Sequence, residues 1–147
     1  MREFSFDSET FVSRPIEEVF TFFGDARDLE VITPPWLHFE ILTPGPISLD
    51  IGTIIDYRIK IHRFAVLWRT RIDAWEPPHR FVDVQLKGPY RLWRHEHLFE
   101  RSKNGTLCLD RVRYAVFGGV LVDQLLVRRD MKAIFEFRSG KLHELFG

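Results

Sequence analysis

Most hydrophobic residues of this chain follow a two-residue repeat, which is typical of strands that bury one face. Stretches rich in Gly, Pro and Asn separate the repeats and favour turns. The expected strands are residues 3–12, 38–42, 53–61, 65–74 and 80–87, followed by the two runs that flank Asn104-Gly105 within residues 87–116. The pattern therefore predicts a sheet of about seven strands.

A repeat of three to four residues, typical of a helix, follows the first strand. Its apolar stripe consists of Ile16, Val19, Phe20 and Phe23. Ser13 can cap this helix and Gly24 ends it. Asp25 can begin a second short helix, which reaches about Val31 before Pro34-Pro35 interrupts the pattern. Two short helices are thus expected after the first strand.

A long amphipathic helix is expected at the end of the chain, from about Val120 to Leu145. Its apolar stripe consists of Leu121, Leu125, Met131, Phe135, Leu142 and Leu145, with Arg128 and Arg138 nearby. An antiparallel sheet with helices on one face is an α+β architecture. We expect a single domain, residues 1–147, with a cavity between the sheet and this helix.

The stretch from Lys87 to Val116 has the most informative pattern of side chains. A two-residue turn at Asn104-Gly105 would pair its two strands, placing His95 opposite Tyr114 and Glu96 opposite Arg113. One face of this hairpin would then carry Trp93, His95, His97, Phe99, Asp110, Val112 and Tyr114. A similar turn at Arg63-Phe64 would set Arg58 opposite Arg69 in the preceding hairpin. The first of these faces is aromatic and contains three ionisable groups.

The direction in which strand 80–87 faces stays open. A three-residue turn at residues 88–90 places Phe81, Asp83 and Gln85 on the same face as His95. A two-residue turn places Val82, Val84 and Leu86 there instead. Asp83 and Gln85 are therefore candidate site residues only with the longer turn.

Composition excludes several classes of protein. Lys and Arg total 21, as do Asp and Glu, so no net charge draws the chain to nucleic acid. The single cysteine, Cys108, excludes an internal disulfide and a thiolate-rich metal cluster. No segment approaches the roughly 18 apolar residues of a membrane span, and the acidic start differs from a signal peptide. We expect a soluble cytoplasmic protein, with its oligomeric state, including a homo-oligomer, left open.

Several stretches together resemble the START/Bet v1-like (SRPBCC) superfamily, in particular its polyketide cyclase/dehydrase-like, ligand-binding branch. These are SRPIEEVF, DARDLEVITPPWL, FVDVQLKGPYRLWRHEHLFE, DRVRY and the ending FEFRSGKL. The resemblance spans nearly the whole chain and implies a helix-grip fold, in which a curved sheet encloses a hydrophobic cavity against the last helix. Oxygenase members of the superfamily bind iron, but His95-x-His97 does not match their helical histidine spacing, so iron is not implied here.

His95 and His97 lie two apart on a strand, so both imidazoles project from the same face. They are candidate catalytic acid–base groups together with Asp110, or they orient a ligand, or they are buried histidines satisfied by neighbours. Asp110 can orient His97 or form a salt link to Arg138 or Arg128. A metal is not expected because no certain third ligand is visible. No nucleotide motif occurs, and no cofactor is expected.

Three functions remain open at the level of sequence. The leading one is binding of a small hydrophobic, aromatic or polyketide-like molecule in the cavity. The second is a cyclase or dehydratase that uses a cavity histidine as general base, and the third is a protein-interaction module with a vestigial cavity. The expected ligand-binding residues are Tyr57, Trp68, Asp83, Gln85, Trp93, His95, His97, Asp110, Tyr114 and Phe135.

Overall fold

The computed structural model describes all 147 residues and contains one antiparallel sheet of seven strands. The strands are β1 (Phe4–Val12), β2 (Glu40–Ile41), β3 (Ile54–Ile61), β4 (Phe64–Glu76), β5 (Arg80–Lys87), β6 (Leu92–Ser102) and β7 (Gly105–Ala115). Their order across the sheet is β1-β7-β6-β5-β4-β3-β2. Strands β2 to β7 thus form a meander, and β1 pairs with the last strand of the chain.

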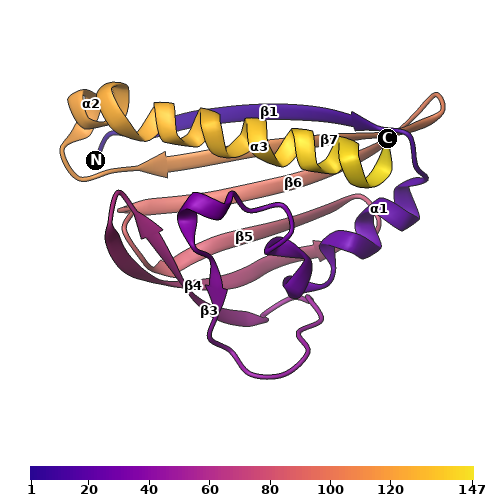
Figure 1. The fold of residues 1–147 in the computed structure, drawn as a ribbon, viewed down its shortest axis with the longest axis horizontal. Coiled ribbons are helices and arrows are strands. Elements are labelled where there is room, and N and C mark those ends of the chain that lie inside the picture. Colours follow the sequence, from indigo (N-terminus) through magenta and orange to yellow (C-terminus); the bar gives the residue numbers. More distant parts are fainter.

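The helical segments come in two groups. After β1 come α1 (Ile16–Phe23) and two short 3-10 turns, η1 (Ala26–Leu29) and η2 (Pro35–Leu37). At the end of the chain, α2 (Gly119–Val122), the π-helical segment η3 (Asp123–Val127) and α3 (Arg128–Phe146) follow one another without a break. Figure 1 shows α3 running along β1 and β7, with α1 beside its C-terminal end. The predicted α+β, helix-grip arrangement is confirmed, and no helix is long and apolar enough to span a membrane.

The two predicted hairpins form, but each turns one residue earlier than expected. Their loops are Lys103-Asn104 and His62-Arg63, so His95 pairs with Val112 and Glu96 with Arg111. A shift of two positions in the pairing keeps each side chain on its predicted face. The predicted pairing of Arg58 with Arg69 is wrong, because Arg69 pairs with Asp56.

Close packing against β1 explains why Gly105 belongs to a strand and not to the turn. A Cβ atom built on Gly105 would lie 2.1 Å from the backbone oxygen of Val12. Asn104 takes the left-handed conformation of the turn, with φ of 68°, which Asn adopts more readily than most residues. The local Asn-Gly signal was therefore correct about the hairpin but not about which residues form its loop.

Strand β5 faces the way that the longer turn predicts. Phe81 pairs with His97, and Asp83 pairs with His95, which puts both β5 side chains on the histidine face. Val82 and Val84 consequently project from the opposite face.

Two groups of buried hydrophobic residues form the core. The larger group packs α1, including Val19, Phe20 and Phe23, against Phe81 and Phe99 of the sheet. The smaller group packs Met131 and Phe135 of α3 against Val112 and Tyr114 of β7. The apolar stripe predicted for the last helix is only partly right, because Leu121 and Leu125 are 67% and 63% exposed and Leu145 is 41% exposed. The two core groups leave a space between the sheet and the helix.

Candidate functional site

A pocket of about 560 Å³ lies between the curved sheet and the C-terminal helical segment. Of its 33 lining residues, 22 are hydrophobic, so its walls suit an apolar molecule. Residues from β3 to β6 form the sheet side, and residues of η3 and α3 form the helix side. The polar groups gather where β5 and β6 face α3.

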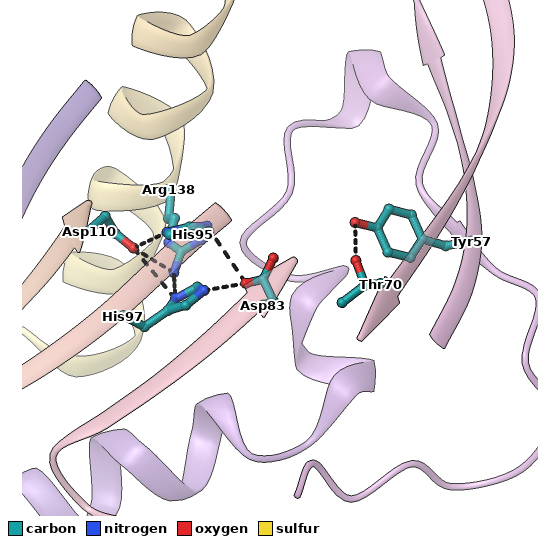
Figure 2. A network of polar contacts seen from close by, with 7 residues as sticks. All are labelled: Tyr57, Thr70, Asp83, His95, His97, Asp110 and Arg138. Atoms are coloured by element: carbon teal, nitrogen blue, oxygen red, sulfur yellow. Dashed lines mark hydrogen bonds and ion pairs between the residues drawn. The ribbon is translucent and has the colours of Figure 1, made fainter. Parts of the chain in front are cut away.

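The polar end of the pocket depends on adjacent strands that expose side chains to the same face. His95 and His97 point inward from β6, and Asp83 points inward from the neighbouring β5. Asp110 lies opposite His97 on β7, on the other side of β6. Arg138 reaches the same place from α3, as Figure 2 shows. Four elements thus supply five ionisable side chains to one cluster.

Each histidine is hydrogen-bonded to its own carboxylate. His95 Nε2 lies 2.7 Å from Asp110 Oδ1, and His97 Nε2 lies 2.6 Å from Asp83 Oδ2 (Figure 2). Arg138 Nη2 lies 3.2 Å from Asp110 Oδ1 and 3.3 Å from His97 Nδ1. Because the guanidinium donates to His97 Nδ1, the ring carries its proton on Nε2 and donates it to Asp83. The network fixes which nitrogen of His97 holds the proton.

The surroundings shift the pKa of three members of this cluster. Burial lowers the pKa of His97 to about 4, helped by the charges of His95 and Arg138 and opposed by Asp83. Burial alone raises the pKa of Asp110 and of Asp83. Positive charge and hydrogen bonds nevertheless bring both below their usual range, with Arg138 acting most on Asp110 and His97 acting most on Asp83. Near neutral pH the cluster therefore holds a neutral His97 and two carboxylates.

Aromatic packing holds the two imidazole rings in place. The rings of His95 and His97 stack at 3.6 Å between centroids, and His97 also stacks on Phe81 at 4.0 Å. Phe135 of α3 meets the His95 ring edge-on at 5.6 Å. The histidines are 5% and 3% exposed, so their orientation is set before any ligand arrives.

An aromatic wall lines the pocket beyond the polar end. Tyr57 stacks on Trp68 at 5.8 Å, and Trp68 meets Trp93 edge-on at 5.3 Å. The hydroxyl of Tyr57 lies 3.4 Å from the hydroxyl of Thr70, and burial raises the pKa of this phenol. Trp68 Nε1 and Arg138 Nε are the two buried side-chain donors without a hydrogen-bond partner, and both residues line the pocket.

Seven of the predicted ligand-binding residues line the pocket, and three do not. Those that do are Tyr57, Trp68, Asp83, Trp93, His95, His97 and Phe135. Gln85 instead bonds the backbone of Tyr90 through both ends of its amide and so holds the β5–β6 turn. Tyr114 is fully buried and donates its hydroxyl to Asp123, and Asp110 lies behind His95. These three residues support the pocket without facing it.

The sequence interpretation missed some lining residues on the helix and at the turns. Ile134 and Leu126 line the helix side, Trp36 comes from η2, and Tyr90 comes from the β5–β6 turn. Their hydrophobic character was visible in the sequence, but their position depends on how η3 and the loop after α1 lie against the sheet. Cys108 is buried and its thiol pKa is raised by burial to about 12, so the structure gives no support for a reactive thiol.

A family model described as polyketide cyclase / dehydrase and lipid transport matches residues 12–138. The chain belongs to this family. The match includes β5, β6, β7 and most of α3, and hence every member of the polar cluster. No curated protein matches the sequence.

Solved structures of other proteins share the fold of this family member at low sequence identity. Protein CV1439 from Chromobacterium violaceum has a TM-score of 0.77 at 11% identity, covering 97% of this chain and 96% of that chain. Ginseng major latex-like protein 151 from Panax ginseng has a TM-score of 0.69 at 11% identity, and the match covers 95% of each chain. Ara h 8.0201 has a TM-score of 0.66 at 16% identity, and the match covers 96% of this chain and 98% of that chain. These likenesses confirm the fold. The family match over residues 12–138 confirms the resemblance to the START/Bet v1-like (SRPBCC) superfamily.

Proposed function

We propose that this protein binds a small, largely hydrophobic molecule in the pocket and orients it through a polar group placed at the Asp83, His97 and Arg138 end. The pocket carries the proposal, because its 560 Å³ and its 22 hydrophobic lining residues suit a molecule of roughly drug size. The hydrophobic ligand-binding fold of the family supports the same function.

The unpaired donors favour a ligand that carries hydrogen-bond acceptors. Leaving a buried donor unpaired costs about 1–3 kcal/mol, and the two such donors of this protein, Trp68 Nε1 and Arg138 Nε, both belong to pocket-lining residues. After a small adjustment of these side chains, a carbonyl, hydroxyl or carboxylate oxygen on the ligand can accept from them. An oxygenated aromatic or polyketide-like molecule meets both requirements.

Filling the pocket tests this proposal. We expect Ile134→Trp to abolish binding of the fluorescent hydrophobic probe 1-anilinonaphthalene-8-sulfonate, because the larger ring occupies the space next to the polar cluster. Lys132→Trp, which adds the same ring at an exposed position of the same helix, is the matched control and should bind the probe normally. Equal probe binding by both folded variants would contradict the proposal. Native mass spectrometry of detergent-free protein then identifies a co-purified ligand.

The two histidine–carboxylate pairs favour a second function, proton abstraction next to a carbonyl group. A histidine oriented by a carboxylate is a common general base. His95 fits this role, because its Nε2 lies 2.7 Å from Asp110 and its Nδ1 is left free to accept a proton. In this role a histidine would remove a proton from carbon and form the enolate that cyclisation requires. NMR detection of α-proton exchange in a bound aromatic ketone in D₂O tests it. The expected result is loss of exchange in His95→Asn but not in His79→Asn, which removes an exposed histidine that does not line the pocket.

The third function, a protein-interaction module with a vestigial cavity, has less support from the structure. Such a module needs no free interior volume, whereas this pocket exceeds the roughly 300 Å³ at which small-molecule sites begin. Two predictions from the sequence accompany the binding proposal: the protein is cytoplasmic, and it has no nucleic-acid partner. The balance of 21 basic and 21 acidic residues supports the absence of a nucleic-acid partner.

A further inference from the structure

The polar cluster also has the composition of a metal site. Asp83, His95 and His97 each offer a ligand atom, and these atoms lie within 4.8 Å of one another. No certain third ligand for the two histidines was visible in the sequence. The direction in which β5 faces supplies Asp83 as that ligand. We propose that Asp83, His95 and His97 bind a divalent transition-metal ion whose open coordination positions face the pocket.

The positions of the donor atoms identify the ligands. His97 Nε2 lies 2.6 Å and His95 Nδ1 lies 3.8 Å from the same oxygen of Asp83, Oδ2. Ligand atoms about 2.0–2.2 Å from a common ion lie roughly 3 Å apart, so small side-chain rotations bring these three atoms to that spacing. Two imidazole nitrogens and one carboxylate oxygen suit Zn²⁺ and Fe²⁺ and leave positions for water or a ligand.

Asp110 provides the independent support. A metal-bound histidine usually donates its other ring N–H to a carboxylate, which orients the ring and raises its basicity. His95 Nε2, the nitrogen that faces away from Asp83, lies 2.7 Å from Asp110 Oδ1. Asp110 does not line the pocket, so it is placed to orient His95 and not to contact a pocket ligand. With an ion on His95 Nδ1, Asp110, His95 and the ion would form a carboxylate–histidine–ion chain.

His97 has to change its proton position when the ion binds. Its Nε2 proton now points to Asp83, so the ion takes the place of that proton, and the ring becomes protonated on Nδ1 instead. Nδ1 lies 3.6 Å from Asp110 Oδ1, which can accept this proton. Arg138 Nη2 then gives up its hydrogen bond to Nδ1 and keeps its contact with Asp110. The ring stays neutral throughout, as a metal ligand must be.

The charges of the cluster favour a divalent cation over an anion. Asp83 and Asp110 contribute two negative charges and Arg138 one positive charge, and the two histidines are neutral when they bind metal. With both histidines neutral, these five groups carry one net negative charge in a buried setting, where electrostatic attraction is strong. With the ion bound, one positive charge remains for an oxygen atom of the pocket ligand. That last step rests on the proposed binding function, whereas the metal site does not.

The histidines of this site lie on a strand, unlike the helical histidine pair of the oxygenases. Both histidines here come from one strand, at positions i and i+2, and the carboxylate comes from the adjacent strand. A rigid sheet holds all three residues, and the aromatic packing of Phe81 and Phe135 fixes the two rings.

Titration of metal-stripped protein with Zn²⁺ and with Co²⁺ tests the proposal. We expect one equivalent of either ion to bind, with visible Co²⁺ absorption bands typical of nitrogen and oxygen ligands and a higher melting temperature in Zn²⁺. Asp83→Asn and His95→Asn should each weaken binding at least 100-fold, and Asp110→Asn about 10–100-fold. His62→Asn removes an exposed histidine that pairs with Asp130 and should leave binding unchanged.

The wild-type protein keeps the test decisive if a variant does not fold. Failure of the wild type to bind either ion at sub-millimolar concentration would overturn the metal site, as would binding that persists in Asp83→Asn but disappears in His62→Asn. Neither result affects the fluorescent-probe experiment, which measures the apolar pocket alone. The metal site and the binding function can therefore fail separately.

Discussion

His97 shows how much a single side chain in this pocket depends on its neighbours. One ring nitrogen donates to Asp83 and the other accepts from Arg138, while one ring face packs on Phe81 and the other on His95. Burial then lowers its pKa to about 4. A histidine of this kind is held in one tautomer and one orientation and stays neutral near neutral pH, which suits binding more than proton transfer.

The partners of His97 predict the cost of removing it. His97→Leu should lower the free energy of unfolding by about 1–3 kcal/mol, because the buried Asp83 carboxylate loses its hydrogen bond. The double variant His97→Leu/Asp83→Leu should lose less free energy of unfolding than the two single variants lose together. In the double variant no buried charge is left unpaired. Urea denaturation of all four proteins measures this. Additive effects would show that the two residues do not interact.

Tyr114 allows a prediction of how stability depends on pH. Burial and the hydrogen bond to Asp123 raise its pKa to about 12, above the value near 10 of an unfolded tyrosine. The folded state therefore keeps this proton while the unfolded state releases it, and the resulting stability is present below pH 10 and is lost as pH rises towards 12. Tyr114→Phe should be less stable at pH 7 and should lose less stability between about pH 9 and 11. Thermal melts across that range check it.

At the level of residues, the sequence predicted which faces are buried but not which side chains bond. His95, His97 and Asp110 were correctly placed on one buried face by the two-residue repeat. Gln85 has the same parity as Asp83, yet it bonds the backbone of Tyr90. Arg138 reaches the cluster from α3, which runs along β1 and β7 (Figure 1). Contacts of this kind arise from three-dimensional packing. The alternation of side chains along one strand shows which face a residue occupies but not which partner it bonds.

Among the elements, the β6–β7 hairpin combines a strong local signal with a constraint from elsewhere. Asn104-Gly105 favours a turn, but the approach of β1 to Gly105 draws the glycine into β7. The last helix shows the same effect, because its apolar residues predicted a continuous buried stripe. The π-helical segment Asp123–Val127 interrupts the α-helical repeat, and Leu121 before it and Leu125 within it both face outward. Elements were thus predictable, whereas their ends and irregular turns were not.

Gly105 offers a direct test at this level. Gly105→Ala should lower the free energy of unfolding by about 1–3 kcal/mol, because the added methyl group would lie 2.1 Å from the Val12 carbonyl oxygen unless β1 moves. Gly140→Ala is a suitable control, since nothing lies within 4 Å of a Cβ atom there and alanine favours a helix. Chemical denaturation compares them. A Gly105→Ala protein as stable as wild type would show that the β1–β7 contact is looser than described.

The whole molecule is a sheet closed by a helix, and the space that they leave is where its function is proposed. Phe135 takes part in both roles, because it packs in the smaller core and also lines the pocket. Family membership was recognisable from motifs spread over the whole chain. The shape of the pocket was not, since its walls come from segments as distant as Trp36 and Arg138.

The double role of Phe135 predicts a linked change in stability and binding. Phe135→Ala should lower the free energy of unfolding by about 3–5 kcal/mol, because it removes a buried ring from the smaller core. The same change enlarges the pocket next to His95 and should shift its preference towards bulkier hydrophobic probes. Denaturation and a probe series of increasing size measure both effects. Unchanged selectivity would place the bound probe away from the polar cluster.

The pairing of β1 with β7 sets the time at which this protein can become functional. Phe4 pairs with Tyr114, so the first strand has to wait for a partner more than one hundred residues later in the chain. Such distant pairing slows folding relative to a protein built from local contacts. The pocket also needs α3, because Phe135 and Arg138 line its helix side. On a nascent chain the proposed binding site therefore forms only after all seven strands and α3 have been made.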